Sequence, residues 1–230
     1  VWETRCRVFG DEAPQTTHSL ASLASLRLQD GMHQDAIRLQ RVVLDSTRKT
    51  FGEAHPDTLR AKAQLANTLR YTGDHDEAGT LLAQVLESRG QVFDEEAPEV
   101  LSAINDYANW LQDRGHSTRA QPMFEKVLEY KKRTFGERHL QTAMARNNLA
   151  AALRTQGRLE DAKKLLVTAY DILSQPEGRN DVHKIVVANH LATVMFHLGK
   201  ENSDAQEQLG AVALQKTLVR DARPTLGKEH

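Results

Sequence analysis

The chain has 230 residues, and its 30 lysines and arginines nearly balance 31 aspartates and glutamates, which leaves a formal charge of −1. This balance gives no general electrostatic reason to bind nucleic acid or an anionic membrane, and a single cysteine, Cys6, cannot form an intrachain disulfide. No apolar stretch approaches the roughly 20 residues that span a bilayer, and the first residues lack the apolar segment of a signal peptide. These features predict a soluble protein of the cytoplasm.

A period of 42 residues organises the chain. Glycine recurs at this step at Gly31, Gly73, Gly115, Gly157 and Gly199. A Leu-Ala or Tyr-Ala pair precedes each glycine and ends in Ala24, Ala66, Ala108, Ala150 and Ala192. Another alanine follows the first four glycines, at Ala36, Ala78, Ala120 and Ala162, and Phe-Gly recurs at 9–10, 51–52 and 135–136. Several markers in one register predict an array of one repeated unit.

Each unit is predicted to form two helices. In residues 98–114 the apolar side chains recur at three- and four-residue steps, proline begins the segment and glycine follows it, which is typical of a helix. By the same period, first helices are expected at 14–30, 56–72, 98–114, 140–156 and 182–198. Second helices are expected at 33–50, 75–91, 117–134, 159–175 and 202–220.

The array is predicted to form one continuous stack over residues 1–230, because a lone hairpin cannot bury both of its apolar faces. It consists of a partial unit, 1–13, and units 14–55, 56–97, 98–139, 140–181 and 182–230. Trp2 falls in register with the core residue Leu44, so the sequence is expected to be a segment of a longer protein. In the irregular last unit, a shift of one residue predicts a buried face formed by Ala205, Leu209, Val212 and Ala213.

These markers resemble the tetratricopeptide repeat (TPR), in the 42-residue variety typical of kinesin light chains. The linker at 51–58 and the segments 147–150 and 120–124 are similar to light-chain repeats. The resemblance implies an all-α, right-handed α-solenoid in which the first helices line a concave surface. The repeats are also similar to the sensor arrays of STAND-type (NB-ARC or NACHT) signalling ATPases.

The face of the first helices opposite the Leu-Ala pairs carries the functional prediction. It holds six of the eight asparagines of the chain and neither lysine nor glutamate. Asparagine is a poor helix former, but its amide offers donors and acceptors to a peptide backbone, and arginine pairs with carboxylates. The predicted groove residues are Arg60, Gln64, Asn67, Arg70, Asn105, Asn109, Asn147, Asn148, Arg154, Asn189 and His190. Alternatively, the asparagines only join adjacent first helices to one another.

The expected partner is a protein or extended peptide that carries acidic residues and an apolar anchor. Arginines in the second and fourth units suit the acidic residues, and Val186 and Phe196 suit the anchor. The absence of lysine from this face argues against the carboxylate clamp of some TPR proteins. The sequence leaves the oligomeric state open.

No phosphate-binding loop, dinucleotide fingerprint, His-Glu-x-x-His or Cys-x-x-Cys motif is present, so no cofactor and no catalytic residue are predicted. His190 and His197 lie two helical turns apart, roughly 10 Å, which is too far to share one zinc ion, so no metal site is predicted. Three functions remain: a binding module, the sensor segment of a signalling ATPase, and an enzyme. The binding module is preferred, and the enzyme would depend on Asp106, Asp113 and His190.

Overall fold

The computed structural model describes residues 14–175 and 181–226, and every regular element in these ranges is an α-helix. The first helices are α2 (Pro14–Gln29), α4 (Pro56–Thr72), α6 (Pro98–Asp113), α8 (Leu140–Thr155) and α10 (Asp181–Glu201). The second helices are α3 (His33–Phe51), α5 (His75–Val92), α7 (Ser117–Phe135), α9 (Leu159–Ser174) and α11 (Ala205–Leu226). The predicted all-α fold is confirmed. The predictions for Trp2, Cys6 and the first Phe-Gly pair lie outside the described residues.

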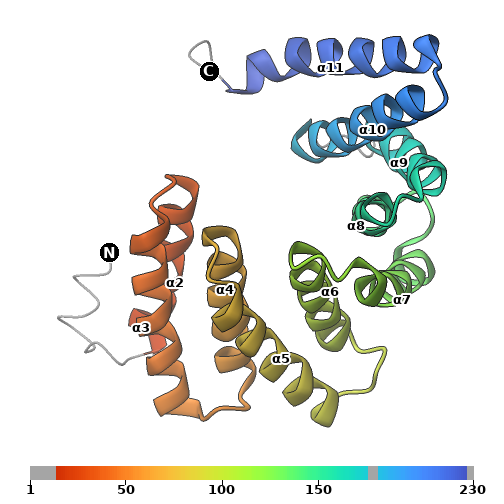
Figure 1. The fold of residues 1–230 in the computed structure, drawn as a ribbon. Helices are drawn as coiled ribbons and strands as arrows, with labels where there is room; N and C mark the ends of the chain where they lie inside the picture. Colours follow the sequence, from red (N-terminus) through yellow and green to blue (C-terminus); the bar gives the residue numbers. More distant parts are fainter. Residues whose placement is uncertain (1–13, 176–180, 227–230) are drawn as a thin grey trace. The chain divides into compact units, whose positions relative to one another are not determined.

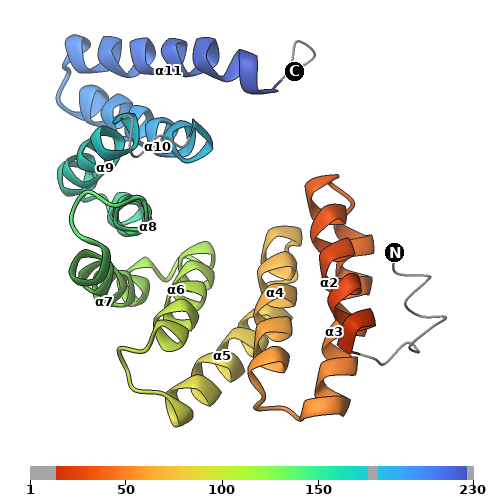
Figure 2. The same cartoon turned by 180° about the vertical axis from the view of Figure 1, so that it is seen from behind.

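The helices form two compact units, Val1–Trp110 and Leu111–His230. In the first unit, α2 packs against α3, α3 against α4 and α4 against α5, and the hairpins can be followed by their labels in Figure 1. In the second unit, α7 to α11 pack in the same consecutive way, and α8 also contacts α10 (Figure 2). This packing of helix-turn-helix units makes the fold an α-solenoid. None of the described helices combines the length and the hydropathy that a membrane span needs.

Small side chains at fixed positions let these helices approach closely. All nine alanines that mark the repeat are at most 1% exposed. In the first unit, Ile37, Leu65, Leu69 and Leu82 join α3, α4 and α5 in one buried cluster. The repeat markers therefore belong to the core, as predicted.

Glycine makes the turn inside four of the hairpins. Gly31, Gly73, Gly115 and Gly157 all have positive φ, between 73° and 97°, which glycine adopts without steric cost. The prediction that Gly199 makes the fifth turn is wrong. Helix α10 continues to Glu201, and Ser203 takes the left-handed conformation at φ 55°.

The last turn therefore comes four residues later than the period predicts. The turn after α10 has the same hydrogen bond as the turn after α8. In the turn after α10 the Asp204 amide donates to the carbonyl of Gly199, and in the turn after α8 the Arg158 amide donates to the carbonyl of Leu153. As a result, α11 presents a different face from the one predicted. Ala211 is buried at 2% exposure, whereas the predicted core residues are exposed. Those exposed residues are Ala205, Leu209, Val212 and Ala213.

The Phe-Gly linkers end one helix and begin the next. Phe51 stacks on His55 with ring centroids 4.5 Å apart, and His55 Nδ1 accepts a hydrogen bond of 3.2 Å from the amide of Asp57 at the start of α4. His139 caps α8 in the same way and stacks on Phe135 at 4.8 Å. Each linker histidine therefore N-caps the first helix that follows it.

The same linkers supply carboxylates to buried cations. Glu53 accepts from Lys62 Nζ at 2.7 Å, and this contact holds the pKa of Glu53 below its usual 4.5. Glu137 pairs with Arg146, which is 6% exposed and also donates to the Glu137 carbonyl at 2.8 Å. Each pair ties a linker to the first helix that follows it.

We expect Glu137→Ala to lower the free energy of unfolding by about 1 kcal/mol, because the buried guanidinium of Arg146 loses its carboxylate but keeps the carbonyl contact. The exposed residue Glu160 in α9 provides a control, since Glu160→Ala should change stability by only a few tenths of a kcal/mol. Urea unfolding of the whole chain measures both variants. Equal losses in the two variants would contradict a structural role for the pair.

Candidate functional site

Two hollows lie between the first helices of the first unit. The smaller one has a volume of about 120 Å³ and is lined by His18 and Ala21 of α2 and by Arg60 and Gln64 of α4, among others. The larger one has a volume of about 450 Å³ and also reaches Gln64. Its lining residues are Ser25, Leu28, His33, Gln40, Gln64, Asn67, Thr68 and Tyr71. The two hollows adjoin at Gln64, so the exposed faces of α2 and α4 border a recessed surface.

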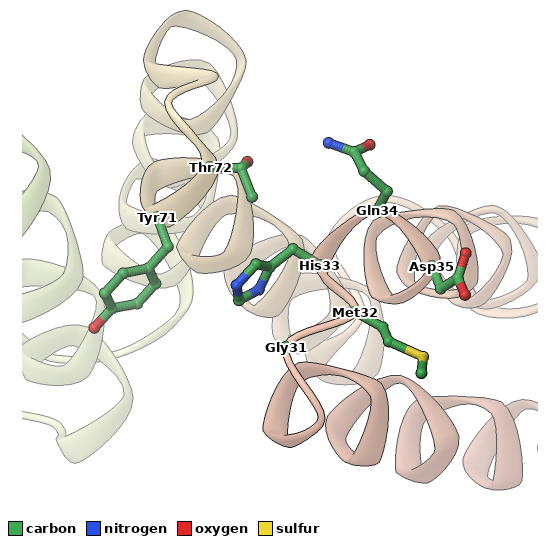
Figure 3. A pocket seen from close by; sticks show the side chains of 7 residues that line it. All are labelled: Gly31, Met32, His33, Gln34, Asp35, Tyr71 and Thr72. Atoms are coloured by element: carbon green, nitrogen blue, oxygen red, sulfur yellow. The ribbon is translucent and has the colours of Figure 1, made fainter. Parts of the chain in front are cut away.

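A third, open hollow of about 590 Å³ lies where the α2–α3 turn meets the end of α4. It shares His33 and Tyr71 with the larger hollow. In Figure 3 these two rings border the same space, whereas Met32 and Asp35 point away from Tyr71. Both rings thus form part of the rim between the two hollows.

The larger hollow contains a residue that the sequence analysis did not select. Gln40 of α3 is 7% exposed, and its Oε1 atom has no hydrogen-bond partner among the described residues. A buried acceptor without a partner costs about 1–3 kcal/mol. His33 and Thr68 were also missed, because the prediction considered only the exposed face of the first helices.

Asn67 connects two first helices. It hydrogen-bonds the side chain of Asp106 in α6, and this bond lowers the Asp106 pKa. Burial has the larger effect and raises the pKa of Asp106 above its ordinary value, while the charges of Arg89 and Arg70 act against burial. This contact is the one expected if the asparagines hold adjacent first helices together.

Asn147 plays the corresponding part in the second unit. Its Oδ1 atom lies 2.8 Å from Nδ1 of His190 in α10, and the residue is only 4% exposed. The prediction that Asn147 lies on the exposed face is therefore wrong: packing of α10 against α8 covers it. Burial, and secondly the charge of Arg154, lower the pKa of His190.

The predicted arginines of α4 contact neighbours on their own helix. Arg60 pairs with Asp57 at 2.6 Å, and the Arg60 side chain is 64% exposed. Arg70 lies over the ring of Tyr71, 4.8 Å from its centroid. Of the remaining predicted residues, Asn189 is exposed, and the others are half-buried. These half-buried residues are Asn105, Asn109, Asn148 and Arg154.

The lowered pKa of His190 predicts that the stability of the fold depends on pH. The pKa of His190 is lower in the folded state than its ordinary value of 6.5, so the unfolded chain takes up a proton at a higher pH than the folded chain does. The free energy of unfolding therefore falls as the pH drops from 6.5 through the folded-state pKa. We expect Arg154→Ala to raise the His190 midpoint in an NMR titration, while burial still keeps it below 6.5. The control Arg158→Ala, at an exposed position, should leave the midpoint unchanged. An unchanged His190 midpoint in Arg154→Ala would contradict the effect assigned to the charge of Arg154.

Metal-binding side chains do not gather at the predicted site positions within the part of the chain that the structure describes. Within 14–175 and 181–226, no three side chains of the types His, Cys, Asp and Glu are grouped so that they could hold a metal ion. Asp106 and His190 belong to different units, so each is described only with its own neighbours. In each unit, the predicted site residues are mostly neutral amides with a few arginines beside them.

Solved structures similar to this chain are repeat arrays. The kinesin light chain nearly identical TPR-like repeats of Podosopora anserina are 26% identical, with 90% of this chain and 98% of that chain covered and a TM-score of 0.71. BtubC (BKLC) from P. vanneervenii is 19% identical, with coverages of 98% and 87% and a TM-score of 0.72. A Rap protein complexed with Competence and Sporulation Factor is 14% identical with a TM-score of 0.72, and 90% of this chain covers 54% of it.

No curated protein matched the sequence. The family model of the tetratricopeptide repeat matches residues 15–91, 57–133 and 99–175, which together reach from α2 to the end of α9. The solved repeats of kinesin light chain type agree with that match over most of the chain. The chain belongs to the tetratricopeptide repeat family.

Proposed function

We propose that the exposed face of the first helices binds an extended peptide segment of a partner protein. TPR arrays are in general scaffolds for protein interactions, and the repeat fold of this chain supports such a role. The observation that carries the finer proposal is the pair of hollows that meet at Gln64 between α2 and α4. A recessed surface lined by amides suits a peptide backbone, which needs both donors and acceptors.

The charges on this face favour acidic residues in the peptide. Arg60 is exposed, and its ion pair with Asp57 is a surface pair that contributes at most about 1 kcal/mol, so a peptide carboxylate can compete for the guanidinium. In the second unit, the positive charge of Arg154 acts on His190. Bidentate pairing with arginine would orient a carboxylate at either position.

Exposed apolar side chains in the second unit favour an apolar anchor. Val186 and Phe196 of α10 are 37% and 47% exposed. Apolar side chains of the peptide that cover Val186 or Phe196 would remove apolar area from water, worth about 25 cal/mol for each Å². The Rap protein of the same fold was solved with Competence and Sporulation Factor, which supports the capacity of such folds to hold a bound factor.

The two classes of asparagine have different roles in this proposal. Asn67 hydrogen-bonds Asp106 and Asn147 hydrogen-bonds His190, so each joins two first helices. Gln64 and Asn189 are exposed and are the amides best situated to contact a peptide. The proposed contact residues are therefore Arg60 and Gln64 in the first unit and, separately, Arg154 and Asn189 in the second unit, with the remaining predicted residues as supports.

Selection of peptides from a random display library on the whole chain tests the proposal, followed by calorimetry with two matched variants. We expect Arg60→Ala with Gln64→Ala to weaken the selected peptides at least 10-fold, which is 1.4 kcal/mol. The control is Arg38→Ala with Gln84→Ala, because Arg38 forms the same type of pair, with Asp35, on the second helix α3. Unchanged affinity in the first variant, or a library that yields no binder, would overturn the proposal.

A further inference from the structure

Gln40 occupies a position that is apolar in the next three units, whereas the same register falls on the half-buried Gln208 in the irregular last unit. The residues at this place in those three units are Leu82, Phe124 and Leu166, and each is 1% exposed. Gln40 is buried to more than nine-tenths, yet its side-chain oxygen has no hydrogen-bond partner among the described residues. An amide in place of an apolar core residue, with its acceptor unpaired, destabilises the unit, so a binding role would account for it better than packing does.

The larger hollow that Gln40 lines has a mostly apolar wall, and its polar side chains include no carboxylate, ammonium or guanidinium group. Gln40, Gln64 and Asn67 supply three carboxamides to its wall. The hydroxyls of Ser25 and Thr68 donate to carbonyls of their own helices at 3.1 Å, and Asn67 is hydrogen-bonded to Asp106. Gln40 and Gln64 are therefore the carboxamides that are best situated to recognise a ligand.

We propose that this hollow is a specificity pocket for a side-chain carboxamide, a glutamine or asparagine of the bound peptide; this inference rests on the proposed function. The ligand amide donates an N–H to Oε1 of Gln40 and accepts an N–H from Gln40 in return. Oε1 is covered in this conformation, and rotation about the soft terminal torsion of the side chain turns it toward the hollow. The volume of about 450 Å³ accommodates the ligand side chain beside the ring of Tyr71.

The pocket discriminates between side chains of the same shape. A glutamate carboxylate lacks the N–H that Gln40 needs, and leucine leaves the buried oxygen unsatisfied. Sites built around a hydrogen bond to the ligand reject analogues that cannot form it. Glutamine is therefore expected to bind at least 10-fold more tightly than glutamate.

Two small probes test the pocket by NMR on the ¹⁵N-labelled whole chain. N-acetyl-L-glutamine N-methylamide is expected to shift the side-chain amide resonances of Gln40, Gln64 and Asn67 saturably, and N-acetyl-L-glutamate N-methylamide is expected to bind at least 10-fold more weakly. Gln40→Leu installs the residue of the same position in the next unit, so it should melt higher than the wild type and lose the response. Gln84→Leu on the exposed side of α5 should keep the response.

Three results would overturn the pocket: no saturable shift with the glutamine probe, equal binding of the glutamate probe, or an unchanged response in Gln40→Leu. The higher melting temperature of Gln40→Leu separates loss of binding from loss of fold. If the display-selected peptides still bind and still depend on Arg60 and Gln64, only the carboxamide pocket fails. If those peptides fail but the glutamine probe binds at Gln40, the peptide proposal alone fails.

Discussion

Replacing Phe124 by alanine is expected to lower the free energy of unfolding by about 3–5 kcal/mol. Phe124 lies in α7, is 1% exposed and is the largest fully buried side chain among the described residues. The loss combines the transfer of the ring with the cavity it leaves, and the neighbouring helices can close that cavity only in part. Urea unfolding followed by circular dichroism measures the effect.

Phe135 at the end of α7 is the matched control. It is 43% exposed and stacks only on His139, with Lys131 5.0 Å from the ring centroid. Phe135→Ala should therefore cost about 1 kcal/mol, the contribution of a partly exposed aromatic pair. If the two alanine variants were equally stable, the position of Phe124 in the core would be contradicted.

Gly79→Leu is expected to lower the free energy of unfolding by about 3 kcal/mol through overpacking. A Cβ atom at Gly79 would lie 2.4 Å from Cζ2 of Trp110. The indole cannot easily retreat, because its Nε1–H donates to the carbonyl of His75 at 2.7 Å and its ring stacks on Tyr107 at 5.3 Å.

The same helix provides the control for this substitution. Gly90 in α5 is exposed, and nothing lies within 4 Å of a Cβ built there. Gly90→Leu should raise stability by about 0.5–1 kcal/mol, because leucine favours the helix more than glycine does. Destabilisation by both substitutions would indicate a backbone requirement for glycine, and the contact with Trp110 would not be the cause.

The sequence predicted the hairpins because each repeat marker has one physical role. Alanines such as Ala66 permit close helix contact, and glycines such as Gly73 permit a left-handed turn. The extrapolation failed at Gly199, because a period cannot reveal an extra helical turn. Ser203 accepted the left-handed conformation in place of glycine, and no local signal marked it.

The site was predicted in part. Arg60, Gln64 and Asn67 were expected on one face of α4, and all three line the hollows beside it. The burial of Asn147 depends on His190 of the next unit, which the pattern within one helix does not contain. Gln40 could have been found from the sequence, because the next three units hold the apolar residues Leu82, Phe124 and Leu166 at the same position of the register.

Photo-crosslinking with a display-selected peptide shows directly which face of the chain binds the peptide. The peptide carries a benzoylphenylalanine at its middle position, and mass spectrometry identifies the residues of the whole chain to which it attaches. We expect attachment on the exposed face of the first helices, around Gln64 in α4. Attachment on the second helices, near Arg38 of α3 or Gln84 of α5, would contradict the proposed function.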